Sequence, residues 1–224
     1  MSTIAKQRLV LLVLYLCLLY LKVYPSLAVH TINENQSLCR DQTVASAGGI
    51  FELGFFQSSE SKTSIWSANW TSSSTSASIH SLLLDSGNFV LLKAGSTSEF
   101  LWQSFDFPTH TWLPGSRLGF SIVSQQTQIL TSWKSYEDPA PGLFSLNPGS
   151  TANHMLWNRS TQYWTSGLWN ESSNSFSLVP EMRLSYVYNF SYGSNKNEGY
   201  FTYSLYDPKR IARFVLSTSG QVSS

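Results

Sequence analysis

Residues 102–115 read Trp102-Gln103-Ser104-Phe105-Asp106-Phe107-Pro108-Thr109-His110-Thr111-Trp112-Leu113-Pro114-Gly115. These fourteen residues contain four aromatic side chains and two prolines. Proline lacks an N–H and clashes with the preceding helical turn, so the stretch cannot be the interior of a helix. It also lacks the regular alternation of a long strand. We therefore predict an ordered loop, anchored by its aromatic rings, that ends one module and begins the next.

On both sides of this loop the sequence predicts short strands separated by turns. Apolar runs flank Asp85-Ser86-Gly87-Asn88, which is a hairpin signal because Gly and Asn tolerate a positive φ. No window after the N-terminal apolar run has helical periodicity over ten residues. The pattern is typical of an all-β sandwich or barrel-like protein. The expected strands are 31–32, 42–56 (with a turn at Gly48-Gly49), 65–70, 82–92, 100–102, 117–120, 128–133, 144–146, 154–158, 162–170, 184–192, 200–206 and 211–216.

Three of these segments carry more detailed expectations. Apolar residues within 50–56 should supply the first aromatic part of the core. Residues 184–192 alternate, which places Tyr186, Tyr188 and Phe190 on one face and Asn189 on the solvated face. Residues 200–206 and 211–216 should form a hairpin around Asp207-Pro208.

The N-terminus has the order of features found in a secretory signal peptide. Lys6 and Arg8 precede an apolar run over residues 9–21, and Ser26-Leu27-Ala28 supplies small residues for cleavage. The run is shorter than the roughly 20 residues that a membrane span needs. We expect residues 1–28 to be removed, the alternative being an uncleaved signal anchor, and the protein to be secreted or extracellular.

The mature chain would be nearly neutral. Removing Lys6, Arg8 and Lys22 from the 14 basic residues leaves 11 against 13 acidic residues, a net charge of −2. A nucleic-acid partner is not expected, because such proteins usually present a basic face. With Cys17 in the signal peptide, Cys39 has no intramolecular partner, and we interpret it as a chance thiol, the alternative being an intermolecular bridge.

Five Asn-x-Ser/Thr sequons lie behind this leader, which predicts a glycosylated extracellular protein. A glycan must sit on the surface, so each of these residues should be exposed. They are Asn35, Asn69, Asn158, Asn170 and Asn189.

The sequence offers no convincing catalytic or metal site. Ser104, Asp106 and His110 are close in sequence, but a triad is recognised by geometry and this stretch has no nucleophile elbow. Glu137-Asp138 is flanked by prolines and is better explained as an exposed turn. The residue types that bind metals are scattered, and no kinase or phosphate-loop motif is found. We expect no enzyme activity, no cofactor and no metal.

The tryptophans favour a packing role. Exposed rings could stack on sugars, but a β core without disulfides needs the packing area of large rings. We expect most of the following to be in the core: Trp102, Trp112, Trp133, Trp157, Trp164 and Trp169.

Several blocks resemble a plant family, the bulb-type (G-type) lectin receptor-like serine/threonine kinases. They are Asp41-Gln42-Thr43, Gly49-Ile50-Phe51-Glu52-Leu53-Gly54-Phe55-Phe56, Leu84-Asp85-Ser86-Gly87-Asn88-Phe89-Val90-Leu91, Trp102-Gln103-Ser104-Phe105-Asp106-Phe107-Pro108-Thr109 and Leu130-Thr131-Ser132-Trp133-Lys134-Ser135. Tyr163-Trp164-Thr165-Ser166-Gly167-Leu168-Trp169-Asn170 resembles the adjoining S-locus glycoprotein domain. The resemblance covers nearly all of residues 31–222.

The resemblance implies three parts: a signal peptide over 1–28, a bulb-type lectin domain over 29–118 and an S-locus glycoprotein domain over 119–224. In that family the lectin domain is a β-prism of three four-stranded sheets, and a Cys-rich region, a membrane helix and a kinase usually follow. The chain ends before those parts and resembles a secreted S-locus glycoprotein cut short, the alternative being a truncated gene model. The lectin part also resembles a shortened prism, with roughly forty to fifty residues absent after Gln57 against an ordinary domain length of about one hundred.

The mannose motif of bulb lectins, Gln-x-Asp-x-Asn-x-Val-x-Tyr, is degenerate in this chain. Asn88 and Val90 match it, whereas Leu84, Ser86 and Leu92 stand where Gln, Asp and Tyr belong. Asp85 is one residue out of register and would point to the other face of the strand. The resemblance therefore implies a non-enzymatic glycoprotein of extracellular recognition and signalling, as in pollen recognition. Its partners would be an extracellular peptide or protein ligand and full-length receptor kinases; the alternatives are a mannose-binding lectin and a fragment of a receptor kinase.

Overall fold

The computed structural model describes residues 30–39, 42–55, 78–97, 99–122, 126–149, 152–158 and 160–224. In these residues nearly all regular structure is β, with two short 3-10 helices and no α-helix, which confirms the all-β expectation. The signal peptide, the shortened joint after Gln57, the expected strand over 65–70 and Asn69 lie outside the described residues. No helix long and apolar enough to cross a bilayer occurs within the described ranges.

The N-terminal strands form one four-stranded antiparallel sheet and a separate two-stranded hairpin. The sheet has the order β1-β4-β5-β6, and β2 pairs with β3. The strands are β1 (Thr31–Asn33), β2 (Thr43–Ala45), β3 (Glu52–Gly54), β4 (Ile79–Leu83), β5 (Phe89–Lys93) and β6 (Phe100–Gln103).

The β4–β5 hairpin has the turn that the sequence predicts. Gly87 has a φ of +84°, and Leu84 N donates to Asn88 O at 2.9 Å. This positive φ favours glycine, and a Cβ at Gly87 would also lie 2.6 Å from Leu113 Cδ1, so that side chain would have to shift. The buried alternate residues Val90 and Leu92 on β5 then face the interior.

The C-terminal strands form two four-stranded sheets, a three-stranded sheet and a hairpin. The orders are β10-β11-β12-β13, β16-β17-β8-β9, β19-β18-β7 and β14-β15. The elements are η1 (Ser104–Asp106), β7 (Thr111–Trp112), β8 (Leu118–Ser121), β9 (Gln126–Gln128), β10 (Leu130–Trp133), β11 (Pro141–Pro148), β12 (Asn153–Trp157), β13 (Thr161–Thr165), β14 (Trp169–Asn170), β15 (Ser175–Phe176), η2 (Pro180–Leu184), β16 (Tyr188–Ser194), β17 (Glu198–Leu205), β18 (Phe214–Leu216) and β19 (Val222–Ser223).

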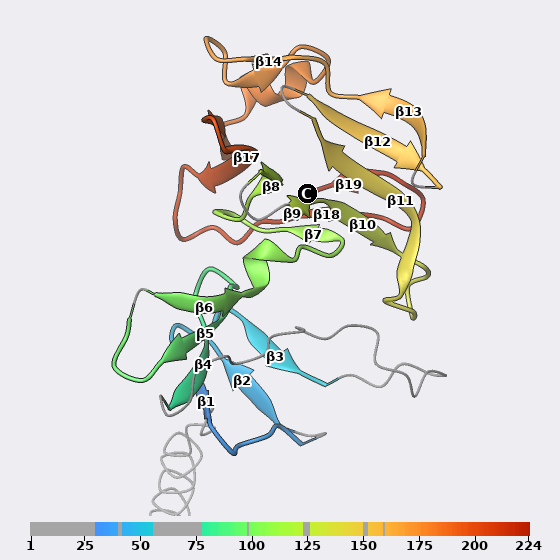
Figure 1. Cartoon of the computed structure of the whole chain (residues 1–224). Coiled ribbons are helices and arrows are strands. Elements are labelled where there is room, and N and C mark those ends of the chain that lie inside the picture. Colours follow the sequence, from blue (N-terminus) through green and yellow to red (C-terminus); the bar gives the residue numbers. More distant parts are fainter. Residues whose placement is uncertain are drawn as a thin grey trace, which may run out of the picture.

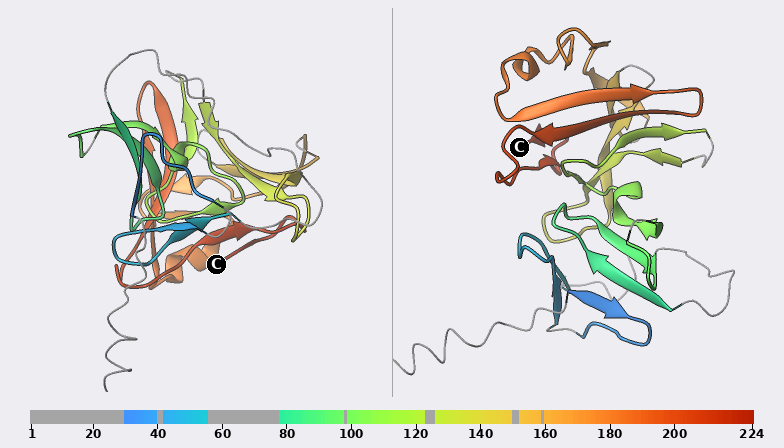
Figure 2. Two further views of the ribbon diagram at one scale, coloured as in Figure 1. Left: turned by 90° about the horizontal axis from the view of Figure 1, so that it is seen from below. Right: turned by 90° about the vertical axis from the view of Figure 1, so that its left-hand side faces the viewer.

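The 102–115 stretch joins these two groups of strands, which Figure 1 shows one above the other. It leaves the N-terminal sheet at the end of β6, turns through η1, and becomes β7. Strand β7 pairs with β18 and β8 pairs with β17, so green strands lie among the red ones (Figures 1 and 2). The expected ordered loop is thus confirmed. It also contains the short strand β7, which the sequence did not predict.

An aromatic cluster holds the C-terminal sheets together. Trp112 is 7% exposed, and its ring centroid lies 4.8 Å from that of Tyr203 and 5.8 Å from that of Phe214. The hydroxyl of Tyr203 donates to the Trp112 carbonyl oxygen at 2.8 Å. Burial raises the pKa of Tyr203 well above its ordinary value, so this phenol stays protonated and remains a donor. The buried members of the cluster are Trp112, Leu118, Leu130, Leu146, Phe176, Phe190, Phe201, Tyr203 and Leu216.

Three of the strand expectations are wrong in detail. Strand β17 pairs with β16 and β8 instead of forming a hairpin with 211–216, because β8 from far upstream takes that edge. Residues 180–184 form η2, which begins at a proline, and Tyr186 is 90% exposed. The segment 162–170 is broken by Gly167, whose φ of +69° ends one strand before β14 begins. For β16 the alternation is confirmed, since Phe190 is buried and Asn189 is exposed.

The expected core residues over 50–56 are mostly on the surface. Ile50, Leu53 and Phe55 are exposed, and Phe56 lies outside the described residues. They belong to or flank the small β2–β3 hairpin, whose β3 is exposed at all three positions, whereas Val44 on β2 is buried. Among the tryptophans Trp112 is buried, Trp102, Trp133 and Trp169 are half-buried, and Trp157 and Trp164 are exposed, against the core expectation for these last two.

Candidate ligand-binding cleft

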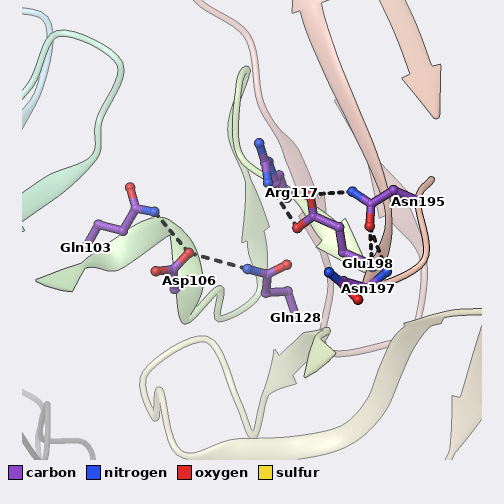
Figure 3. A network of polar contacts seen from close by, with 7 residues as sticks. All are labelled: Gln103, Asp106, Arg117, Gln128, Asn195, Asn197 and Glu198. Atoms are coloured by element: carbon purple, nitrogen blue, oxygen red, sulfur yellow. Dashed lines mark hydrogen bonds and ion pairs between the residues drawn. The ribbon is translucent and has the colours of Figure 1, made fainter. Parts of the chain in front are cut away.

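A polar cleft of about 480 Å³ opens where the N-terminal sheet meets the β16-β17-β8-β9 sheet. The end of β6, η1, the segment before β8, strand β9 and the start of β17 contribute its walls (Figure 3). Its volume lies within the usual range for small-ligand sites. The lining residues are Asn88, Gln103, Phe105, Asp106, Gly115, Ser116, Arg117, Phe120, Ser121, Gln126, Gln128, Glu198 and Tyr200.

Asp106 is held in the cleft by two glutamine amides. Gln103 Nε2 donates to Asp106 Oδ1 at 3.0 Å, and Gln128 Nε2 donates to the same oxygen at 3.4 Å. Figure 3 shows this carboxylate between the two amides. Burial raises the pKa of Asp106, and the two amides and the Arg117 charge oppose that rise only in part. The two amides thus fix the position of a half-buried acceptor.

Asn88 supports this arrangement from the turn immediately before β5. Its amide nitrogen donates to Gln103 Oε1 at 2.9 Å, while its oxygen accepts from Ser104 Oγ and from the Phe105 backbone N–H. Asn88 is 4% exposed. The residue therefore ties β5 to the end of β6 and to η1, and it orients the glutamine that holds Asp106.

Replacing Asn88 by alanine should lower the free energy of unfolding by about 1–3 kcal/mol, because buried partners would lose their hydrogen bonds. Urea denaturation followed by circular dichroism measures this loss. Asn33→Ala, at an exposed position of β1, is the matched control and should change stability by about 0.5 kcal/mol or less. Equal losses in the two variants would contradict the supporting role of Asn88.

The opposite wall of the cleft presents a cation beside an aromatic ring. The guanidinium of Arg117 lies 4.1 Å from the centre of the Tyr200 ring, and its Nη1 is 3.6 Å from Glu198 Oε2. Glu198 Oε1 also accepts from Asn195 Nδ2 at 3.2 Å. Asn195 Oδ1 accepts the backbone N–H groups of Asn197 and Glu198, which fixes the β16–β17 turn at the rim (Figure 3).

The raised pKa of Asp106 gives a pH-dependent stability with a defined sign. The native state favours the protonated carboxyl of Asp106. The stability that this protonation contributes is fully present below the unfolded pKa of about 4 and is lost as pH rises through the higher folded pKa. Asp106→Asn keeps an oxygen for the two amides and carries no charge. The variant should therefore gain stability relative to the wild type between pH 3.5 and pH 7, measured by thermal unfolding. Asp138→Asn should show the opposite trend, since the Ala140 N–H and Lys134 lower the pKa of Asp138.

The two matching residues of the degenerate sugar motif, Asn88 and Val90, make structural contacts within the fold. Val90 is fully buried, and Asn88 has the three bonds described above. The four sequon asparagines within the described ranges, Asn35, Asn158, Asn170 and Asn189, are all exposed, as a glycan requires. Cys39 is also exposed, and its thiol is free.

The three residues weighed as a triad have different partners. Ser104 Oγ bonds Asn88 and the Phe89 N–H, Asp106 bonds the glutamines, and the His110 ring lies 4.4 Å from that of Trp133. Burial and the charge of Arg213 lower the pKa of His110. Asp138 pairs with Lys134 at 3.1 Å in an exposed turn, as expected from its prolines. No cluster of metal-ligating side chains occurs among the residues that the structure describes.

Sequence reasoning missed most of the cleft. Arg117, Gln128 and Glu198 come from three strands or loops that meet only because β8 pairs with both β9 and β17. Gln103 and Asp106 lie in the 102–115 stretch. There the sequence predicted an ordered loop but gave no indication that these two side chains would line a cleft.

Comparison with known proteins assigns the two halves of the chain to known domains. A family model described as D-mannose binding lectin matches residues 29–134, and one described as S-locus glycoprotein domain matches residues 164–224. A G-type lectin S-receptor-like serine/threonine-protein kinase of Arabidopsis thaliana is 39% identical over 89% of this chain and 30% of its own length. A second such kinase of that plant is 39% identical over 70% of this chain and 18% of its own length. An S-locus-specific glycoprotein of Brassica oleracea is 30% identical over 94% of this chain and 59% of its own length. The chain thus spans less than two thirds of each of these relatives.

Proposed function

Because the chain belongs to the family of G-type lectin S-receptor-like kinases and S-locus glycoproteins, matching their lectin and S-locus ectodomain part, we propose that it acts in extracellular recognition. The observation that carries the proposal is the polar cleft, which draws its walls from both halves of the chain. A preorganised acceptor beside an arginine is suited to binding a polar ligand, and binding requires no chemistry.

The proposal includes a secreted or extracellular glycoprotein with a signal peptide over 1–28, a bulb-type lectin domain over 29–118 and an S-locus domain over 119–224. The boundary at 118–119 falls within β8, so we expect the two domains to fold as one unit. The chain would recognise an extracellular peptide or protein ligand, as in pollen recognition, and act together with full-length receptor kinases. Kinase activity would belong to a longer product. The four exposed sequon asparagines support the extracellular location.

Expression in secreting plant cells tests the location and the glycosylation together. The expected product appears in the medium, begins near Val29 and moves faster on a gel after endoglycosidase treatment. Asn→Gln changes at the five sequons should each remove one step of that shift. An unglycosylated product that keeps residues 1–28 and remains in the cytosol would contradict the proposal.

Mannose binding is the second candidate, favoured by the description of the matched lectin family. It would use Asn88 in the β4–β5 turn and Val90 on β5. Against it stand the three structural hydrogen bonds of Asn88 and the absence of the motif's Gln, Asp and Tyr at positions 84, 86 and 92. Retention on a mannose-agarose column, and elution by free methyl mannoside, would favour this second function.

A further inference from the structure

We propose that a groove between the β2–β3 hairpin and the loop that follows β17 docks an acidic segment of a partner protein. An apolar side chain of that segment would enter the groove, and its carboxylates would pair with cations on the rim. The groove is distinct from the Asp106 cleft, with which it shares only Gly115 among the described lining residues. The inference rests on the proposed recognition function, for which it names a contact surface and the chemistry of the partner.

The groove has a largely apolar lining that is open to solvent. Its volume is about 440 Å³, and Phe51, Pro114, Leu205 and Pro208 contribute to the lining. Ile50 on one wall is 46% exposed, and Ile211 on the other is 72% exposed. Removing such aliphatic surface from water favours association, so an apolar side chain of a partner would gain by entering the groove.

Three cations lie at or beside the rim of this groove. Lys209 and Arg210 line it, Arg213 follows on the same loop, and all three are exposed. No ion pair joins any of them to another residue in the part of the chain that the structure describes. The turn that carries them is ordered, because Asp207 Oδ1 accepts the Lys209 N–H at 3.0 Å and the Asp207 carbonyl oxygen accepts the Arg210 N–H at 3.1 Å. Carboxylates of a partner could therefore pair with these cations without breaking an existing ion pair.

Asp85 brings a negative charge to the groove, but its hydrogen bonds belong to the β2–β3 turn. Its Oδ1 accepts the Gly48 N–H at 2.7 Å, and hydrogen bonds from Gly48 and Ser46 lower the pKa of its carboxyl. Ser46 Oγ in turn accepts the N–H groups of Ile50 and Phe51 at 3.1 and 3.2 Å. This wall of the groove is thus fixed before a partner arrives, which reduces the ordering cost of binding.

The apolar lining beside the cations selects among anionic partners. A simple polyanion would pair with Lys209 and Arg210 and leave Ile50 and Ile211 in water. A peptide segment with a leucine, isoleucine or phenylalanine next to aspartate or glutamate would use both features. We therefore assign the groove to such a segment, with a polyanion as the competing outcome of the test.

A second copy of this chain is another possible occupant. Its Tyr136-Glu137-Asp138 turn places a ring that is 84% exposed next to two carboxylates. The Asp138 carboxylate, however, already pairs with Lys134 at 3.1 Å in its own chain. Docking of this turn would have to compete with that ion pair, so a different protein is the better match for the groove.

The test is a selection of random peptides, displayed on phage, against the purified full chain. Affinities of the selected peptides are then measured by fluorescence polarisation. The enriched peptides should carry acidic residues next to an apolar one, and their binding should weaken as the salt concentration rises. Dextran sulfate, added as a competitor, serves as the probe for a simple polyanion.

Matched variants locate the binding. The double change Lys209→Glu and Arg210→Glu reverses two exposed charges and should weaken the selected peptides by about tenfold or more. Lys196→Glu makes the same change at an exposed cation of the β16–β17 turn and should leave the affinity unchanged. Ile211→Ser removes exposed apolar surface from the groove and should also weaken binding. Circular dichroism checks that each variant keeps the β fold.

Four results would overturn the inference. The first is enrichment of no peptide, or of peptides without acidic residues. The second is equal affinity for the double variant and the wild type, including a case in which only Asp106→Asn weakens binding. The third is full displacement of the peptides by dextran sulfate together with full affinity in Ile211→Ser. The fourth is a dimer in sedimentation that Tyr136→Ser abolishes.

The groove and the proposed function can fail separately. Loss of binding in Asp106→Asn alone would move recognition to the polar cleft and leave the proposed function standing. Failure of secretion or glycosylation would overturn that function without changing the peptide affinities of the purified chain.

Discussion

Replacing Trp112 by alanine should lower the free energy of unfolding by about 3–5 kcal/mol, the usual cost of emptying a large aromatic site in a core. The ring is 7% exposed and touches the rings of Phe190, Tyr203 and Phe214. Its Nε1 also donates to the Ser116 carbonyl oxygen at 3.1 Å, immediately before Arg117 of the cleft. The substitution would therefore remove packing between β7, β16, β17 and β18 and loosen the segment that positions Arg117.

Urea unfolding of purified protein, followed by circular dichroism, gives this difference. Trp157→Ala makes the same chemical change at a side chain that is 50% exposed. It should cost about 1 kcal/mol or less. If the Trp157 variant were destabilised as much as the Trp112 variant, Trp112 would not be the centre of the C-terminal core.

Replacing Gly119 by alanine should cost about 3 kcal/mol or more, the upper end of what overpacking does. Gly119 on β8 lies opposite Tyr200 on β17. An added Cβ would collide with the Gly199 carbonyl oxygen and lie 2.6 Å from the Tyr200 Cα. These are backbone atoms of the neighbouring strand, so relief requires the two strands to separate. Tyr200 and Arg117 would move with them, which would change the shape of the cleft.

Gly95→Ala is the control for this prediction. Gly95 has a φ of +85° and open space around its Cβ position, so alanine there is strained but does not collide. Its expected cost is about 1–2 kcal/mol. Melting temperatures of both variants and the NMR shifts of Arg117 and Tyr200 separate the two effects. An alanine at Gly119 that is tolerated as well as one at Gly95 would show that the β8–β17 pairing is not tightly packed.

The sequence predicts local structure in this chain better than it predicts the neighbours of each strand. The Asp85–Asn88 turn, the alternation over β16 and the ordered 102–115 stretch follow from residues a few positions apart. The hairpin expected over 200–216 is wrong because β8, about eighty residues upstream, pairs with β17 in its place. Nothing in Leu118-Gly119-Phe120 specifies that partner, because many short apolar segments would fit the same edge.

The dependence on long-range strand pairing also explains why the sequence did not predict the candidate site. The resemblance to a sugar motif singled out Asn88, but in the structure its side chain donates to Gln103 and orients that residue. Asp106 is weighed in the sequence as a catalytic residue and lies instead between two amides. Arg117 and Glu198 are eighty-one positions apart and have no local signal, since long-range pairing alone brings them to one cleft.

The pairing of β8 with β17 has a consequence for biosynthesis. Ribosomes add roughly 5–20 residues per second, so residues 118–121 would wait about 4 to 17 s before residue 205 has been made. During that interval β7 and β8 lack the strands that later cover Trp112 and Leu118, and nascent apolar edges of this kind are prone to aggregate. Ribosome-bound chains stalled after residue 184 should therefore bind chaperones persistently, and chains stalled with β19 outside the exit tunnel should release them.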